Sequence, residues 1–157
     1  MLACFLAEPA LVTGALMDRW ARDFDNWAIC DTACFHLFDK PPLRDWPDGL
    51  AHKKVVAWAG ERDEFVRRAA FALIASLALH DKQARDEVFL AYLPLVERHA
   101  NDDRNLVKKA VSWALRGIGK RNAALNRRAS ALARRLCDAD AASARWIGRD
   151  ALRDLAE

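Results

Sequence analysis

Apolar residues recur every three or four positions from one end of the 157-residue chain to the other. This spacing places them along one face of an α-helix, whereas a half-buried strand would alternate every second residue. The pattern breaks at short polar or proline-containing joints such as Glu8-Pro9, Gly60 and Asn101-Asp102. Abundant alanine and leucine and only six glycines also favour helix. The sequence predicts helices over residues 2–7, 12–23, 25–38, 47–58, 62–80, 83–99, 103–119, 121–137 and 141–155.

Short amphipathic helices joined by short loops must bury their apolar faces against one another. Two all-α architectures achieve this, a helical bundle and a stacked array of helix pairs. Pairs that recur about 40 residues apart are typical of HEAT-like repeats. Self-similarity between the pairs is weak, so periodicity alone leaves the bundle open. We expect one domain over residues 1–157, and a stack would give it a concave surface lined by alternate helices, which could hold a duplex.

The charge of the chain is divided unevenly along its length. Residues 1–103 hold 12 Lys and Arg against 17 Asp and Glu, whereas residues 104–157 hold 13 against 5. The overall charge of +3 therefore combines an acidic part with a strongly basic one. A basic segment of this kind indicates a polyanion-binding face, and a solvated helical surface is the alternative.

Membrane and secretion signals are missing from the sequence. No stretch approaches the roughly 20 uncharged apolar residues that cross a bilayer. The apolar opening MLACFLAEPAL has no basic start and carries Glu8, which is atypical of a signal peptide. Cys4, Cys30, Cys34 and Cys137 show no CxxC spacing, so reduced cysteines are a better interpretation than a disulfide or zinc site. We predict a cytoplasmic protein.

Several catalytic signatures are also missing. The sequence has no Gly-rich phosphate loop, no HExxH pair, no Ser–His–Asp pattern and no helix-hairpin-helix motif. Its four histidines do not cluster. We therefore expect no metal and no cofactor.

The segment NWAICD, residues 26–31, places a charge in an otherwise apolar stretch. Trp27 and Asp31 are four residues apart and share one helix face, while Phe24 and Phe35 are expected on the buried side. An unpaired carboxylate there would be costly. Asp31 is thus either a functional group or a carboxylate hydrogen-bonded to a helix terminus or an arginine.

The segment FVRRAAF, residues 65–71, carries two adjacent arginines. Phe65 and Ala69 can face the core while Arg67 and Arg68 leave it. An arginine projected from the middle of a helix can bind a phosphate bidentately or pair with an aspartate such as Asp31. A plain surface arginine is the alternative.

The third segment, residues 105–121, is the most basic. Lys109, Trp113, Arg116 and Lys120 fall on one stripe of a helix. Cations interrupted by an aromatic ring suit a face that neutralises phosphates and packs a ring against sugar or base. A tryptophan packed between helices is the alternative.

Together the three segments resemble the AlkD-like DNA alkylation repair family. That family shows a Trp followed four residues later by an Asp, then aromatic–x–x–Arg–x–Ala, then Lys–Ala–x–x–Trp–Ala–Leu–Arg. This chain has Trp27 and Asp31, FVRRAA at residues 65–70 and KAVSWALR at residues 109–116. The last match is the most specific, and the resemblance covers essentially the whole chain from residue 2 onward.

The resemblance implies a HEAT-like α–α superhelix, a solenoid of antiparallel helix pairs. It implies a DNA glycosylase that excises positively charged N3- or N7-alkylated purines from duplex DNA without a deep base pocket. Glycosidic-bond cleavage is then carried by Asp31, Trp27 and Trp113, with Asp31 stabilising the oxocarbenium-like sugar and positioning water. The DNA-binding residues are expected to be Arg68, Lys109, Arg116, Lys120 and Arg121. Two departures from the family pattern, Phe65 in place of a frequent Trp and Ala28 in place of a frequent acid, leave these residues intact.

Two other functions stay open at the level of sequence. One is a HEAT-like DNA-binding protein that keeps the basic groove but catalyses nothing. The other is a protein–protein scaffold, a role that many α-solenoids have. An excision assay on alkylated duplex separates the first from the glycosylase, and salt-dependent DNA binding separates the second.

Family members usually carry further helices before the point where this chain starts. The chain is therefore expected to correspond to the central and C-terminal part of the family fold. Residues 2–5 have the pattern of a helix interior. We expect this first helix to expose an apolar edge that promotes self-association.

Overall fold

The computed structural model describes residues 1–156, and all regular structure within them is helical. The α-helices are α1 (Leu2–Leu6), α2 (Gly14–Asp23), α3 (Trp27–Ala33), α4 (Leu50–Ala59), α5 (Glu64–His80), α6 (Asp86–Leu90), α7 (Leu93–His99), α8 (Asn105–Gly119), α9 (Ala123–Cys137) and α10 (Ala142–Leu155). A 3₁₀ turn, η1 (Pro9–Leu11), precedes α2, and a π-helical turn, η2 (Cys34–Phe38), extends α3. None of these helices is both long and apolar enough to cross a bilayer. The predicted all-α fold is confirmed.

Side-chain caps fix where several of these helices begin. Thr13, Asn26 and Asn122 each accept a hydrogen bond from the backbone N–H three residues later, at 3.2, 3.0 and 2.9 Å. Asp63 accepts two, from the backbone of Phe65 and Val66. Such caps satisfy N–H groups that have no partner within the helix. They start α2, α3, α9 and α5, respectively.

One predicted helix is wrong, because residues 83–99 form two helices instead of one. Helix α6 ends at Leu90, and a new helix, α7, begins at Leu93 with Pro94 in its first turn. Proline has no N–H to donate to a carbonyl one turn earlier, so a helix cannot run through it without losing a bond. In the first turn that N–H would be unpaired anyway, which makes this the position where proline is tolerated.

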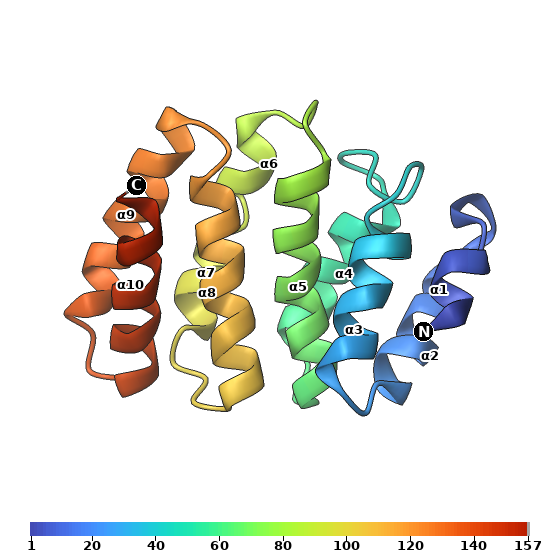
Figure 1. Ribbon diagram of the computed structural model, residues 1–157, viewed down its shortest axis with the longest axis horizontal. Coiled ribbons are helices and arrows are strands. Elements are labelled where there is room, and N and C mark those ends of the chain that lie inside the picture. The colour runs from blue at the N-terminus through green and yellow to red at the C-terminus, as the bar shows by residue number, and fades with distance from the viewer. Residues whose placement is uncertain (157) are drawn as a thin grey trace.

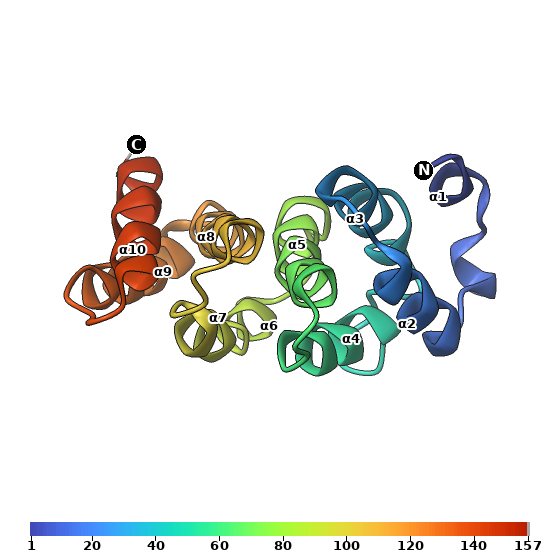
Figure 2. The same ribbon diagram turned by 90° about the horizontal axis from the view of Figure 1, so that it is seen from below.

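The helices form consecutive pairs that stack side by side (Figure 1). In Figure 2, where the stack runs across the picture and most helices are seen roughly end-on, α2, α4, α7 and α9 form an outer row, and α3, α5, α8 and α10 form an inner row toward which both ends curve. The inner helices begin about 40 residues apart, at Trp27, Glu64, Asn105 and Ala142. This arrangement is a HEAT-like α-solenoid, as predicted.

Helix α5 lies at the centre of the stack and packs against α4, α8, α3 and η2. Its core positions are rich in alanine, and Ala75 and Ala78 face Gly117 of α8. A Cβ atom added to Gly117 would lie 3.5 Å from the Cα of Ala75 and 3.5 Å from the Cβ of Ala78. These small residues let α8 come close to α5. Side chains from η2 and α8, on opposite sides of α5, can therefore meet across it.

The first helix exposes an apolar surface. Leu2, Phe5 and Leu6 are 70%, 56% and 72% exposed, while Cys4 is buried against the rest of the fold. We propose that these three side chains mediate self-association, since contact between apolar patches removes them from water. Light scattering at rising concentration is expected to show dimers or larger species, and the variant Leu2→Glu/Leu6→Glu should stay monomeric. A monomeric wild-type protein at every concentration would contradict this.

Candidate active site

The inner face of α3 and η2 carries a row of three side chains one helical turn apart. Asn26 caps α3, so Trp27 lies in its first turn, Asp31 one turn later and Phe35 one turn beyond that. The Trp27 side chain is largely exposed, and that of Asp31 is 17% exposed. The sequence correctly placed Trp27 and Asp31 on one face. Phe35, predicted on the buried side, is partly buried and packs against the core, and its spacing of four from Asp31 also brings it onto this face.

Asp31 is held by Arg68, which comes from the middle of α5. The Nε of Arg68 donates to one carboxylate oxygen at 3.0 Å, and Nη2 donates to the other at 2.7 Å. The third nitrogen, Nη1, donates to the backbone oxygen of Leu106 at the start of α8 at 2.7 Å. One guanidinium thus ties together three inner helices. The Arg68 side chain is only 8% exposed.

This geometry corrects the expectation that Arg68 leaves the core and contacts DNA. A buried guanidinium is costly unless its donors are satisfied, and all three contacts lie within the protein. Its partner is Asp31, the other possibility that the sequence left open. Arg67, its neighbour, turns the opposite way and donates to Asp102 at 2.8 Å. Asp102 also accepts from Arg104, and these hydrogen bonds hold the pKa of its carboxyl well below the usual range.

The pairing with Arg68 gives the carboxylate of Asp31 a fixed orientation. A planar guanidinium that donates to both oxygens holds the plane of the carboxylate. Each oxygen has a second lone pair that can still accept a hydrogen bond. Because Asp31 is partly exposed on the inner face, a small polar group or a cationic centre can approach that side of it.

Trp113 lies at the far end of the row and stacks on Phe35. The ring centroids are 5.0 Å apart and the planes differ by 9°. The indole belongs to α8 and the phenyl ring to η2, so the contact spans α5, where the small side chains leave room. Trp27 lies about 12 Å from Phe35 along the helix. The three residues predicted to be catalytic therefore share one inner face, with the two indoles at opposite ends and Asp31 between them.

The basic stripe of α8 is present, but most of it is paired with acids of α10. Lys120 contacts Asp154 at 2.8 Å, and Arg116 contacts Asp154 at 3.2 Å and Asp150 at 3.6 Å. The hydrogen bond from Lys120 helps to hold the pKa of Asp154 below its ordinary value. Lys109 is exposed and makes no ion pair with the residues that the structure describes.

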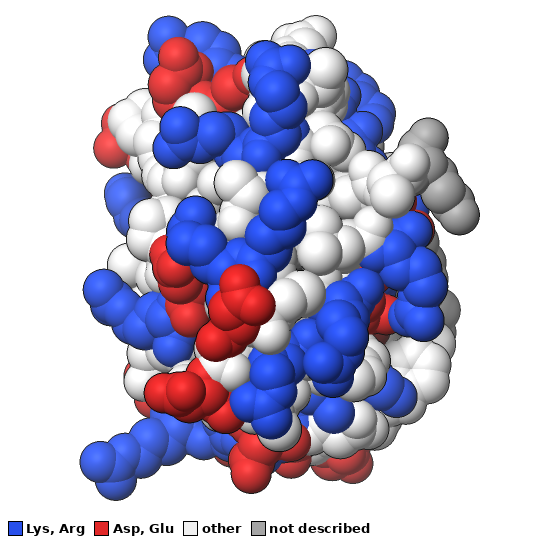
Figure 3. Space-filling model, turned by 90° about the vertical axis from the view of Figure 1, so that its left-hand side faces the viewer, with Lys and Arg blue, Asp and Glu red and all other residues white. Residues whose placement is uncertain are grey.

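Further cations, which the sequence analysis missed, extend the basic stripe. Arg149 and Arg153 on α10 are exposed beside the Asp150–Asp154 pair, and Arg153 contacts Asp150 at 2.6 Å. The end of the stack formed by α9 and α10 shows many Lys and Arg side chains with acids between them (Figure 3). Their four-residue spacing on a helix was a usable signal. The α9–α10 end of the stack is therefore rich in cations despite its acids.

Arg121, predicted to bind DNA, lies at the edge of this surface beside Arg116 and Lys120, but its guanidinium is engaged within the protein. Its guanidinium donates to the backbone oxygens of Ala78, Asp81 and Ala84 at 2.8, 2.8 and 3.0 Å. It also lies 4.0 Å from the centroid of the Phe89 ring, a cation–π contact. Through its two terminal nitrogens Arg121 therefore satisfies carbonyl groups at the end of α5 and in the following loop.

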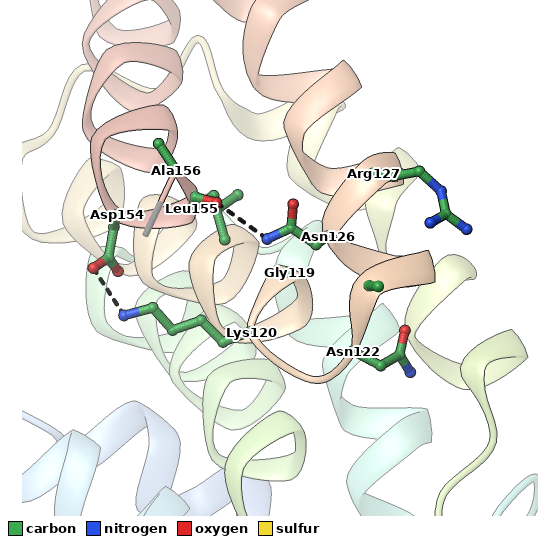
Figure 4. A pocket seen from close by; sticks show the side chains of 9 residues that line it. Gly119, Lys120, Asn122, Asn126, Arg127, Asp154, Leu155 and Ala156 are labelled. Carbon is green, nitrogen blue, oxygen red and sulfur yellow. Dashed lines mark hydrogen bonds and ion pairs between the residues drawn. The ribbon is translucent and has the colours of Figure 1, made fainter.

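Two hollows lie close to the stripe. One of about 200 Å³ is bordered by Ala78, Leu79, Trp113, Arg116 and Lys120, and it opens beside the proposed site. A wider one of about 620 Å³ lies where the α8–α9 turn meets the end of α10. There Asn126 donates to the backbone oxygen of Leu155, and Arg127 points away from the hollow (Figure 4). Only the first adjoins the aromatic side chains of the inner face, Trp27, Phe35 and Trp113, which we call the aromatic row.

No group of three or more His, Cys, Asp or Glu side chains within residues 1–156 is arranged to hold an ion. The four cysteines are free, and Cys30 and Cys34 are buried beside α5, where their thiols approach the backbone oxygens of Phe65 and Ala69.

The fold and the site together define a helical-repeat protein with a carboxylate and two indoles on a basic inner face. The family model of DNA alkylation repair enzymes matches residues 1–155. The chain belongs to that family, which confirms the resemblance seen in the sequence and gives the protein a role in DNA repair. No curated protein and no solved structure matches the chain significantly.

Proposed function

We propose that this protein is a DNA glycosylase that excises purines carrying a positive charge from alkylation at N3 or N7. One observation carries the proposal, the carboxylate of Asp31 held by Arg68 between Trp27 and Trp113. The substrate is duplex DNA that lies along the inner row of helices. The damaged base does not enter a deep pocket in this reaction, and the open form of the inner face supports this.

The protein does not need to protonate the damaged base, because its positive charge already makes it a good leaving group. The bond between C1′ and the base nitrogen breaks, and its electron pair neutralises the base. The sugar that remains has oxocarbenium character, and a fixed carboxylate near C1′ stabilises that charge. Water then adds to C1′ and loses a proton to solvent. The indole faces of Trp27 and Trp113 favour a cationic nucleotide through cation–π contact.

Lesion charge provides the test of this reaction. Duplexes that contain one 7-methylguanine or one 3-methyladenine should release the free base. Duplexes with a neutral lesion at the same position, such as hypoxanthine or uracil, should release none, since no acid protonates the base in this mechanism. Equal release of charged and neutral bases would contradict it.

Two exposed lysines, Lys109 on α8 and Lys120 directly after it, are proposed to contact phosphates. The double variant Lys109→Gln/Lys120→Gln should weaken binding to all sequences alike and reduce the slope of log affinity against log salt by about 2, near one unit for each lost phosphate contact. Fluorescence anisotropy titrations from 50 to 300 mM salt measure this slope, because the screening of phosphate contacts changes over that range.

A matched control removes two exposed cations from the outer row, as Lys53→Gln/Arg134→Gln. It changes the net charge equally, so its salt slope should stay near that of the wild-type protein. If the salt slope falls by the same amount in both double variants, binding responds to net charge alone, and the α8 stripe has no special part in it.

A non-catalytic DNA-binding protein is the second candidate, because both oxygens of Asp31 are already engaged by Arg68. In that case the ion pair only joins α3 to α5. DNA affinity would then depend on Lys109 and Lys120 as above, but no lesion would be released. The lesion series therefore separates the two functions.

A further inference from the structure

A buried acid lies behind the aromatic row. Asp39 follows η2 directly and its side chain is 0% exposed. One carboxylate oxygen accepts hydrogen bonds from the Ser76 hydroxyl and from Nδ1 of His80, both on α5. The other lies 2.8 Å from Nζ of Lys40. Both Ser76 and His80 approach the acid itself, so the cluster is not a relay that would activate the serine.

His80 links this acid to the aromatic row. Its ring meets Phe35 edge to face, with centroids 5.3 Å apart and planes at 81°. Phe35 in turn stacks on Trp113. Nζ of Lys40 also donates to the backbone oxygen of Phe35 at 2.8 Å. Contacts thus run without a gap from Asp39, through His80 and Phe35, to the indole of Trp113.

We propose that Phe35 is a positioning residue that sets the plane of the Trp113 indole, and that the Asp39–His80 pair holds Phe35 in place. The proposal rests on the proposed function for its consequence in catalysis, but the contacts stand independently of it. An edge-to-face contact on one side and a stacked contact on the other favour one ring orientation. Phe35 itself need not contact DNA.

The π-helical turn explains how Phe35 reaches this place. In η2 the backbone N–H of Asp39 donates to the oxygen of Cys34, five residues earlier, at 3.2 Å. The wider turn lets Asp39 enter the core beneath α5 while Phe35 stays on the inner face. Single π turns of this kind are frequent at functional sites.

The test begins with Phe35→Leu, which keeps an apolar side chain and removes the ring. Single-turnover excision of 7-methylguanine should slow by about tenfold to a hundredfold, as expected when a reacting geometry is loosened. Affinity for undamaged duplex should change less than twofold, because no phosphate contact is lost. Phe35→Tyr retains the ring and should recover most of the rate.

Phe71→Leu is the matched control. Phe71 is a buried phenylalanine of α5 that also meets a histidine, His99, at 5.8 Å between ring centroids. Its replacement should lower the melting temperature. The excision rate should fall only in proportion to the fraction of the protein that remains folded. If Phe71→Leu and Phe35→Leu slow excision alike, Phe35 acts only through stability, and the proposal is overturned.

A second readout does not need activity. In protein labelled with 5-fluorotryptophan, the ¹⁹F resonance of Trp113, identified through Trp113→Phe, should shift and broaden in Phe35→Leu and in His80→Asn. His80→Asn keeps a donor for Asp39 and loses the ring. An unchanged Trp113 resonance in Phe35→Leu would overturn the positioning role. A changed resonance in a protein that releases no base would leave that role standing and reject the glycosylase.

Discussion

Replacing Asp31 by Asn is expected to slow the excision of 7-methylguanine by about a hundredfold to a thousandfold, the usual loss when a preorganised group that stabilises transition-state charge is removed. Asparagine has nearly the same shape and its amide oxygen can still accept one hydrogen bond from Arg68, but its NH2 group cannot accept the other, and the negative charge near C1′ disappears. Affinity for undamaged duplex should change little or rise slightly, because a negative charge leaves the DNA-facing surface. Single-turnover kinetics and anisotropy measure the two effects separately.

Asp18→Asn provides the comparison for this variant. Asp18 lies on the outer row and also forms an ion pair, with Nζ of Lys54 at 2.6 Å. Its loss removes the same charge far from the aromatic row and should leave the excision rate unchanged. Full activity of Asp31→Asn would remove Asp31 from the mechanism.

Replacing Arg68 by Leu is expected to lower the free energy of unfolding by about 3–5 kcal/mol, the typical cost of breaking a buried ion pair from one side. The change leaves Asp31 charged without its partner, and the backbone oxygen of Leu106 loses its donor. The double variant Asp31→Asn/Arg68→Leu should lose less than the sum of the two single changes, since no unpaired charge then remains. Urea denaturation of the four proteins gives the coupling.

Arg135→Leu tests whether any ion pair between repeats behaves in this way. Arg135 contacts Glu97 at 3.1 Å on the outer surface, where both side chains are about half exposed. Such pairs contribute about 0–1 kcal/mol. An equally small loss for Arg68→Leu would show that the Asp31–Arg68 pair is not the structural tie that its three contacts indicate.

The helices could be predicted because their signal is local. A spacing of three and four apolar residues, interrupted at polar joints, is sufficient to locate most of them. The split between α6 and α7 was also readable, since Pro94 stands in the sequence, but its effect depended on which turn of the helix it entered. The π turn at residues 34–38 had no sequence signal of that kind.

The candidate site could be predicted only in part, because side-chain partners lie on other repeats. Arg67 and Arg68 are neighbours of identical type, and only the positions of Asp31 on α3 and of Asp102 in the loop before α8 decide which one turns inward. Arg121 looks like a continuation of the basic stripe until the end of α5 supplies three carbonyl oxygens for it. In stacked repeats each unit contacts its neighbours, so these partners recur about one repeat away.

The most direct measurement is release of free base by the purified wild-type protein, held in excess over a duplex with a single 7-methylguanine. The liberated base and the abasic site are both quantified against time. We predict equal amounts of both products, formed faster than in duplex alone, with a rate that rises with protein concentration until the DNA is saturated. Release no faster than spontaneous depurination, at a concentration where all the DNA is bound, would contradict an excision site built from Asp31, Trp27 and Trp113.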